Sequence, residues 1–262
     1  MRKYISVLAL DVRCTIYKIL GVIILMSGAQ LGNFYRVLQR NLARWNQYNY
    51  NMDPSEYNML ILTFEQAIEE GYIQFFFGAM VVFVCAILIW GCSEHGKVRS
   101  RFLLWRLRIE RRQVYVVWSI YRTFIIALVI AWQLLLVVIM NEMYQSIIAN
   151  EMAPQSLFLA FYRNLFLHSL LPLSDVFGMV WLSIFVVLCG MGTAYIGYRD
   201  ITEHQSACSA VLGVMAYATL FVTVGILSEV RWLAVLTVIV AFITIICMII
   251  SVKGSLGAHY DG

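Results

Sequence analysis

The sequence predicts an all-α membrane protein with six transmembrane helices. Its 262 residues are 61% hydrophobic and 13% charged, with a mean hydropathy of +0.78, whereas soluble domains are about half apolar and a quarter charged. The apolar residues form stretches long enough to cross a hydrocarbon core of about 30 Å. The densest positive charge, in residues 97–113, lies between two such stretches. Because cytoplasmic loops carry an excess of Lys and Arg, we expect this segment and both chain termini to be cytoplasmic at a cell (plasma) membrane.

The N-terminal residues predict two consecutive helical elements. Residues 3–15 alternate apolar and charged positions at helical spacing, which is typical of an amphipathic elbow helix on the cytoplasmic surface. The first span follows at 16–35. Gly28 and Gly32 are four residues apart, a spacing that lets helices approach closely, so we expect this span to pack inside the bundle.

The other spans are apolar stretches bounded by polar residues. We place them at 73–90, 114–140, 176–195, 207–227 and 232–252. Arg122 lies about two turns into the span at 114–140. A charge within a span is a candidate functional site because its burial is costly; Arg122 is either paired or extended to the cytoplasmic headgroups, and its position favours the second.

Two polar segments on the outer side each predict an amphipathic helix. The first covers 54–70, where Asp53 and Glu56 are placed as helix-start residues and Gly71 as the stop. The second covers 155–171 and is too short and too charged to be a span. These helices either pack over the bundle or gate a pathway. The candidate outer-gate residues are Tyr57, Phe64, Phe161 and Arg163.

No sequence motif for catalysis is evident. The chain lacks a phosphate-binding glycine loop, an H-E-x-x-H metal motif and a G-x-S-x-G nucleophile motif. Cys92 and His95 have a metal-ligand spacing without a second pair, and we expect the six cysteines to be buried apolar residues without disulfides. The net charge of +4 comes mainly from 97–113 and the N-terminus, so it indicates topology and not nucleic-acid binding. We expect neither an enzyme nor a cofactor or metal site in this chain.

The basic segment 98–113, VRSRFLLWRLRIERRQ, predicts an amphipathic cytoplasmic helix between spans two and three. One face is apolar and another is basic, as in helices that lie on a membrane surface or dock on a partner. The apolar face carries Phe102, Trp105 and Ile109. The basic face carries Arg101, Arg108 and Arg112. No repeat or flexible linker divides the chain, so we expect residues 1–262 to form a single transmembrane domain.

The elbow, the six spans and this cytoplasmic helix resemble the permease subunit of ABC-2-type exporters. In that family the loop commonly ends in leucine, proline, an aliphatic residue, serine and arginine, followed by polar residues, a tyrosine and a lysine. The matching residues are Leu107, Ile109, Arg111, Gln113 and Tyr115, and the departures are Arg108 for proline, Glu110 for serine and Trp118 for lysine.

The resemblance implies a coupling helix that docks on a separate cytoplasmic ATP-binding cassette ATPase, which binds ATP and Mg²⁺. The coupling residues would be Phe102, Leu103, Trp105, Arg106, Ile109 and Arg111. It also implies a second permease subunit, identical or similar, that completes the pathway. An amphipathic or lipid-like cargo fits the aromatic outer segments. The alternatives are a basic helix that binds anionic membrane lipid, and a non-transporting scaffold, immunity or sensor subunit.

Overall fold

The computed structural model describes residues 2–48, 62–90, 111–148, 157–173 and 176–203. Within these ranges the chain is mostly helical and has no strand. The long helices are α1 (Arg2–Tyr48), α4 (Ile73–Trp90), α6 (Arg111–Ile147) and α9 (Val176–Glu203). The short helices are α3 (Phe64–Glu70), α7 (Leu157–Arg163) and α8 (Leu165–Leu170).

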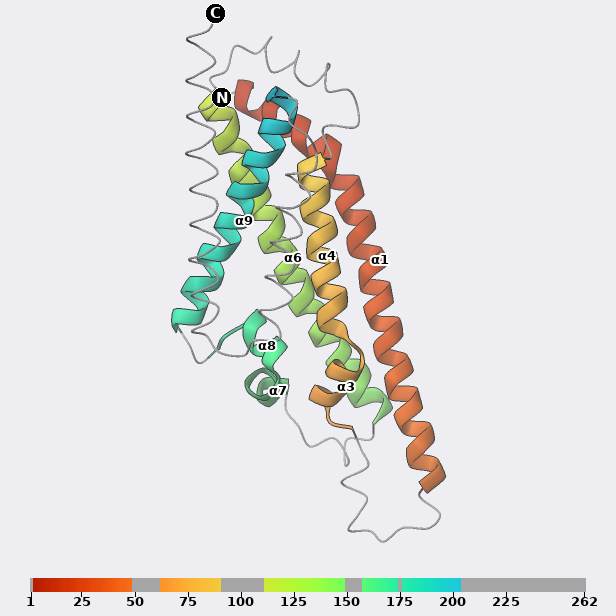
Figure 1. Ribbon diagram of the computed structural model, residues 1–262. Helices are drawn as coiled ribbons and strands as arrows, with labels where there is room; N and C mark the ends of the chain where they lie inside the picture. Colours follow the sequence, from red (N-terminus) through yellow and green to blue (C-terminus); the bar gives the residue numbers. More distant parts are fainter. Residues whose placement is uncertain (1, 49–61, 91–110, 149–156, 174–175, 204–262) are drawn as a thin grey trace, which may run out of the picture.

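The four long helices lie side by side as a bundle, and the three short ones gather at one end (Figure 1). Three segments are long and apolar enough to cross a membrane, namely 11–45 in α1, 113–147 in α6 and 176–194 in α9. Helices α3 and α4, bent by 55° at the break between them, meet the same criterion only when taken together. The described residues thus contain three candidate spans, or four if the bent pair is one span. The spans predicted at 207–227 and 232–252 lie outside the described residues.

Helix α1 is one continuous helix of 47 residues, about 70 Å long at 1.5 Å per residue. Figure 1 shows its first turns at an angle across the end of the bundle, with no interruption of the helix before the long remainder. The elbow and the first span were predicted as separate elements, but in 2–48 they differ only in direction and no break in the helix separates them. The first span was expected to pack inside the bundle, and α1 does pack against α4 and α6. Gly28 and Gly32 are nevertheless exposed, so these two glycines do not make the contact.

Helix α3 begins at a cap inside the helix predicted at 54–70. Leu62 and Thr63 are not helical, and Thr63 caps α3. The Thr63 hydroxyl accepts a hydrogen bond from the Gln66 backbone N–H (3.4 Å), and the Gln66 side chain accepts one from the Thr63 N–H (3.1 Å). This reciprocal capping box stabilises a helix start at Phe64. Gly71 ends α3 as predicted, whereas the predicted start residues near 53–56 lie outside the described ranges.

The outer helix predicted at 155–171 is two short helices. Asn164 has extended backbone angles, and its side chain accepts a hydrogen bond from the Leu167 N–H (3.1 Å). An asparagine in this position starts a new helix, and it therefore divides α7 from α8.

The core lies between the long helices and continues to the short ones. It is formed by large apolar side chains such as Phe34, Phe77, Met80, Leu88 and Val137. Other large apolar side chains point away from the bundle, with Tyr17 80% exposed. Outward faces that are this apolar are compatible with a membrane location.

Candidate functional site

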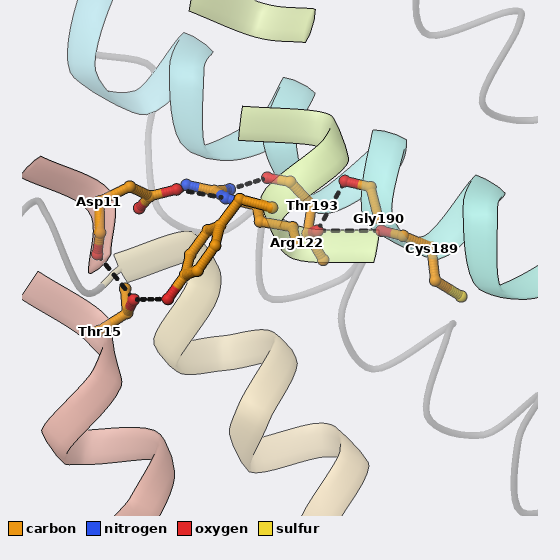
Figure 2. A network of polar contacts seen from close by, with 7 residues as sticks. Asp11, Thr15, Arg122, Cys189, Gly190 and Thr193 are labelled. Carbon is orange, nitrogen blue, oxygen red and sulfur yellow. Dashed lines mark hydrogen bonds and ion pairs between the residues drawn. The ribbon is translucent and has the colours of Figure 1, made fainter. Parts of the chain in front are cut away.

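A buried ion pair joins α1 to α6. Asp11 and Arg122 are both 0% exposed, and the Arg122 Nε donates to the Asp11 Oδ2 at 3.3 Å (Figure 2). Taking two charges out of water is costly, and their attraction offsets this cost only with good geometry and further hydrogen bonds. Such a pair inside an apolar bundle marks a candidate functional site.

The same guanidinium also contacts α9. Its Nη1 donates to the Thr193 backbone oxygen at 2.5 Å, and its central carbon lies 5.2 Å from the centre of the Trp118 ring. A Cβ added at Gly197 would lie 2.6 Å from Nη1. The lack of a side chain at Gly197 therefore lets α9 approach the guanidinium, and Arg122 holds three helices together.

Hydroxyl groups surround the ion pair. The Thr15 hydroxyl donates to the Asp11 backbone oxygen at 2.7 Å and shares a 2.9 Å hydrogen bond with the Tyr121 hydroxyl. On α9, the Thr193 hydroxyl donates to the backbone oxygens of Cys189 and Gly190 (Figure 2). These bonds fix the polar residues next to the charges and keep the site on α1, α6 and α9.

Polar contacts between α1 and α6 continue along the bundle. The Trp132 indole N–H donates to the Ser27 hydroxyl at 2.8 Å, and the Gln133 Nε2 donates to the Gln30 Oε1 at 2.9 Å. Both glutamines are 0% exposed. We call this set the α1–α6 polar seam. Its members are Asp11, Thr15, Ser27 and Gln30 on α1, and Tyr121, Arg122, Trp132 and Gln133 on α6.

At the other end of α6, aromatic and polar contacts tie α6 to the short helices. Phe64 of α3 packs edge-on against Phe34 and Tyr144, and the Tyr144 hydroxyl donates to the Leu62 backbone oxygen at 2.8 Å. Between the short helices, the Asn164 side chain donates to a Glu69 carboxylate oxygen at 3.2 Å. Helix α6 therefore contacts both the buried ion pair and helix α3.

The candidate outer-gate residues divide into buried and exposed ones. Phe64 and Phe161 belong to the same hydrophobic core, while Arg163 is exposed at the end of α7. Burial is the main cause of a raised pKa at Glu65. The positive charge of Arg163 partly lowers this pKa, and the negative charge of Glu69 raises it further. Tyr57 lies outside the described residues. Whether this cluster gates or only packs stays a prediction.

The predicted coupling residues lie almost entirely outside the described residues. Only Arg111 falls inside, as the first residue of α6, and its side chain is not described. The predicted docking contacts therefore stay a prediction.

The ion pair corrects the prediction for Arg122. We expected its side chain to extend to the cytoplasmic headgroups, but it is fully buried and paired. Its counterion is Asp11, from the segment predicted as a surface elbow. The two residues are 111 positions apart in the sequence. The only sequence signals for the pair are the charge of Arg122 within a span and the acidic Asp11 in the predicted amphipathic elbow.

The described residues contain no group of three or more His, Cys, Asp or Glu side chains that could hold a metal ion. Cys92 and His95 are outside the described ranges. Cys14, Cys85 and Cys189 are free, and the last two are buried.

Comparison with known proteins leaves the family open, since no family model, curated protein or solved structure matches the chain.

Proposed function

We propose that the chain is the transmembrane permease subunit of an ATP-binding cassette exporter of the ABC-2 type. It would lie in the plasma membrane with both termini cytoplasmic, and move an amphipathic or lipid-like substrate. ATP and Mg²⁺ would be bound by a separate cytoplasmic ATPase, and a second permease subunit would complete the pathway.

The observation that carries this proposal is the extent of α6. It begins at Arg111, inside the predicted coupling segment, and runs without a break to Ile147 beside the outer helices. A helix of 37 residues is about 55 Å long. Movement of the coupling segment would therefore reach the outer end of the bundle through one continuous element.

The ion pair supports a mechanical role for α6. Arg122 lies 11 residues after Arg111, about 17 Å along the helix. Through Asp11 and Thr193 it contacts the two neighbouring helices. A displacement of α6 by an ATPase would thus be transmitted to α1 and α9.

The same continuity also favours the alternative, a sensor or scaffold subunit. A ligand bound at the outer helices would move Tyr144, and α6 would carry the signal to the cytoplasmic segment. The two functions differ in energetics: an exporter needs ATP hydrolysis that its cargo stimulates, and a sensor does not.

The test is the variant Trp105→Ala with Arg111→Glu, reconstituted in vesicles with the partner ATPase. We expect ATP hydrolysis to continue while transport is lost, because the coupling helix no longer transmits the movement. The matched control is Phe124→Ala with Arg13→Glu, which makes comparable chemical changes at two exposed positions of the bundle. Normal transport by the Trp105/Arg111 variant would contradict the coupling role.

A further inference from the structure

The outward face of α1 carries a column of arginines. Arg36, Arg40 and Arg44 are exposed and four residues apart on one continuous helix. Positions i and i+4 lie on the same side of a helix, about 6 Å apart along its axis. The three guanidinium groups therefore form a positive column about 12 Å long near the C-terminal end of α1.

These arginines are not neutralised by the part of the bundle that the structure describes. No carboxylate in the described ranges forms an ion pair with any of the three. An exposed, uncompensated cluster of guanidinium groups attracts anions, and arginine matches phosphate with two parallel hydrogen bonds.

Before the column, α1 has an apolar stretch in which Gly28 and Gly32 carry no side chain, and we call the surface over these two glycines the apolar trough. A Cβ added at Gly28 or Gly32 would meet no atom within 4 Å. Large apolar side chains flank these glycines, with Leu25 66% and Tyr35 46% exposed. The surface thus changes from an apolar trough to a basic column at Arg36.

We propose that this face of α1 binds a phospholipid with an anionic headgroup. Its acyl chain would lie along Gly28 and Gly32, and its phosphate would contact Arg36 and Arg40. The positive arginines favour an anionic headgroup. The apolar trough next to them favours a lipid over a soluble anion, because an acyl chain can cover it. This proposal does not depend on a transport function.

The length of the column makes the proposal more specific. The headgroup layer of one leaflet is about 5–8 Å thick. With Arg36 at the edge of the hydrocarbon, Arg40 lies within the layer and Arg44 lies beyond it. Loss of Arg36 or Arg40 should therefore weaken lipid binding more than loss of Arg44.

The experiment uses the full chain in mild detergent, with binding of phosphatidylglycerol and of phosphatidylcholine measured by native mass spectrometry. The test variant is Arg36→Gln with Arg40→Gln. Each arginine near an anionic surface contributes about fivefold, so phosphatidylglycerol binding should fall about 25-fold. The control, Arg13→Gln, removes the charge of another exposed arginine on α1; it is compared with the single variant Arg36→Gln and should change binding little.

Two further variants test the site itself. Arg44→Gln should have a smaller effect than Arg36→Gln, and Gly32→Leu should reduce phosphatidylglycerol binding by filling the trough. Circular dichroism of each variant should match that of the parent protein, because all of these positions are exposed.

Four results would overturn the proposal. The first is equal binding of the two lipids, and the second is an equal loss in the control variant. The third is displacement of the lipid by inorganic pyrophosphate with no effect of Gly32→Leu, which would assign the column to a soluble anion. The fourth is a change in the oligomeric state of Gly32→Leu with lipid binding unaltered, which would assign the trough to a second copy of the chain.

Discussion

Helix α6 packs differently against its two neighbours. Where it crosses α9 it contacts a glycine, Gly190, whereas along α1 it contacts carboxylate, hydroxyl and amide side chains. A Cβ at Gly190 would overlap the Thr123 hydroxyl and lie 2.6 Å from the Thr123 Cα. At Gly190 the α6–α9 contact is therefore close packing of backbones, and the Arg122–Thr193 hydrogen bond lies one helical turn away. The α1–α6 polar seam instead consists of side-chain hydrogen bonds and one ion pair.

The comparison teaches that one helix can use two kinds of contact. Close packing depends on shape, so any added atom at the crossing point disrupts it. A polar seam depends on matched partners, so removal of one partner costs more than removal of both. Three predictions test this difference, from the largest expected effect to the smallest, and a fourth, smaller one concerns the short helices α3 and α7.

The ion pair should show the largest effect. Asp11→Leu leaves the Arg122 guanidinium buried without its carboxylate, which should lower the free energy of unfolding by about 3–5 kcal/mol. The double variant Asp11→Leu with Arg122→Leu should recover much of this loss, because no buried charge remains. Thermal unfolding in detergent measures both. A double variant no more stable than Asp11→Leu would contradict a matched pair.

The glycine contact should show the next effect. Gly190→Ala places a methyl group against the Thr123 backbone, and overpacking of this kind costs about 1–3 kcal/mol. Gly28→Ala is the matched control because its Cβ would meet nothing within 4 Å. The melting temperatures of the two variants give the comparison, and equal values would show that α6 and α9 are not in backbone contact at Gly190.

The glutamine pair should show a smaller effect. Gln30→Leu leaves the Gln133 amide buried without its partner, at a cost of about 1 kcal/mol. The double variant with Gln133→Leu should be close to the parent protein, since both polar groups are gone. A double-mutant cycle on unfolding free energies measures the coupling, and additive losses would remove the glutamines from the seam.

A weak pH dependence is expected at the end of the bundle where the short helices lie. Burial raises the pKa of Glu65 above its ordinary value of 4.5, so the folded chain holds this proton more tightly than the unfolded chain. The stability that this bound proton contributes is fully present at a pH below the ordinary pKa of Glu65. It is lost as the pH rises through the raised pKa of the folded chain.

Glu65→Gln should reduce this loss of stability. Arg163→Gln should move it to higher pH, because the Arg163 charge opposes the rise in the Glu65 pKa. Unfolding temperatures across the acidic range measure both variants. Identical pH profiles for all three proteins would show that Glu65 is not coupled to Arg163.

Some of this fold could be predicted from hydropathy alone. Helix α4 has the bounds predicted for the second span, 73–90, because its apolar residues carry no charge and polar residues flank them. Helix α9 begins at the predicted Val176. Helices made of one continuous apolar stretch are determined locally, and a sequence pattern is enough to find them.

The contacts between helices could not be predicted in the same way. Gly28 with Gly32 and Gly190 with Ala194 have the same spacing, yet the first pair is exposed and the second is buried. The α7–α8 break depends on an Asn164 side chain that also contacts α3. Such features depend on residues far apart in the chain, and a single sequence does not say which of them meet.

The proposed function rests on α6 as the element that connects a cytoplasmic ATPase to the rest of the bundle. The most direct test is purification of the chain from its native cells in mild detergent, followed by mass spectrometry of the proteins that stay bound. We expect a cytoplasmic ATPase in fixed ratio to the chain. A chain that purifies alone, or only with another membrane protein, would contradict the exporter and favour the scaffold or sensor.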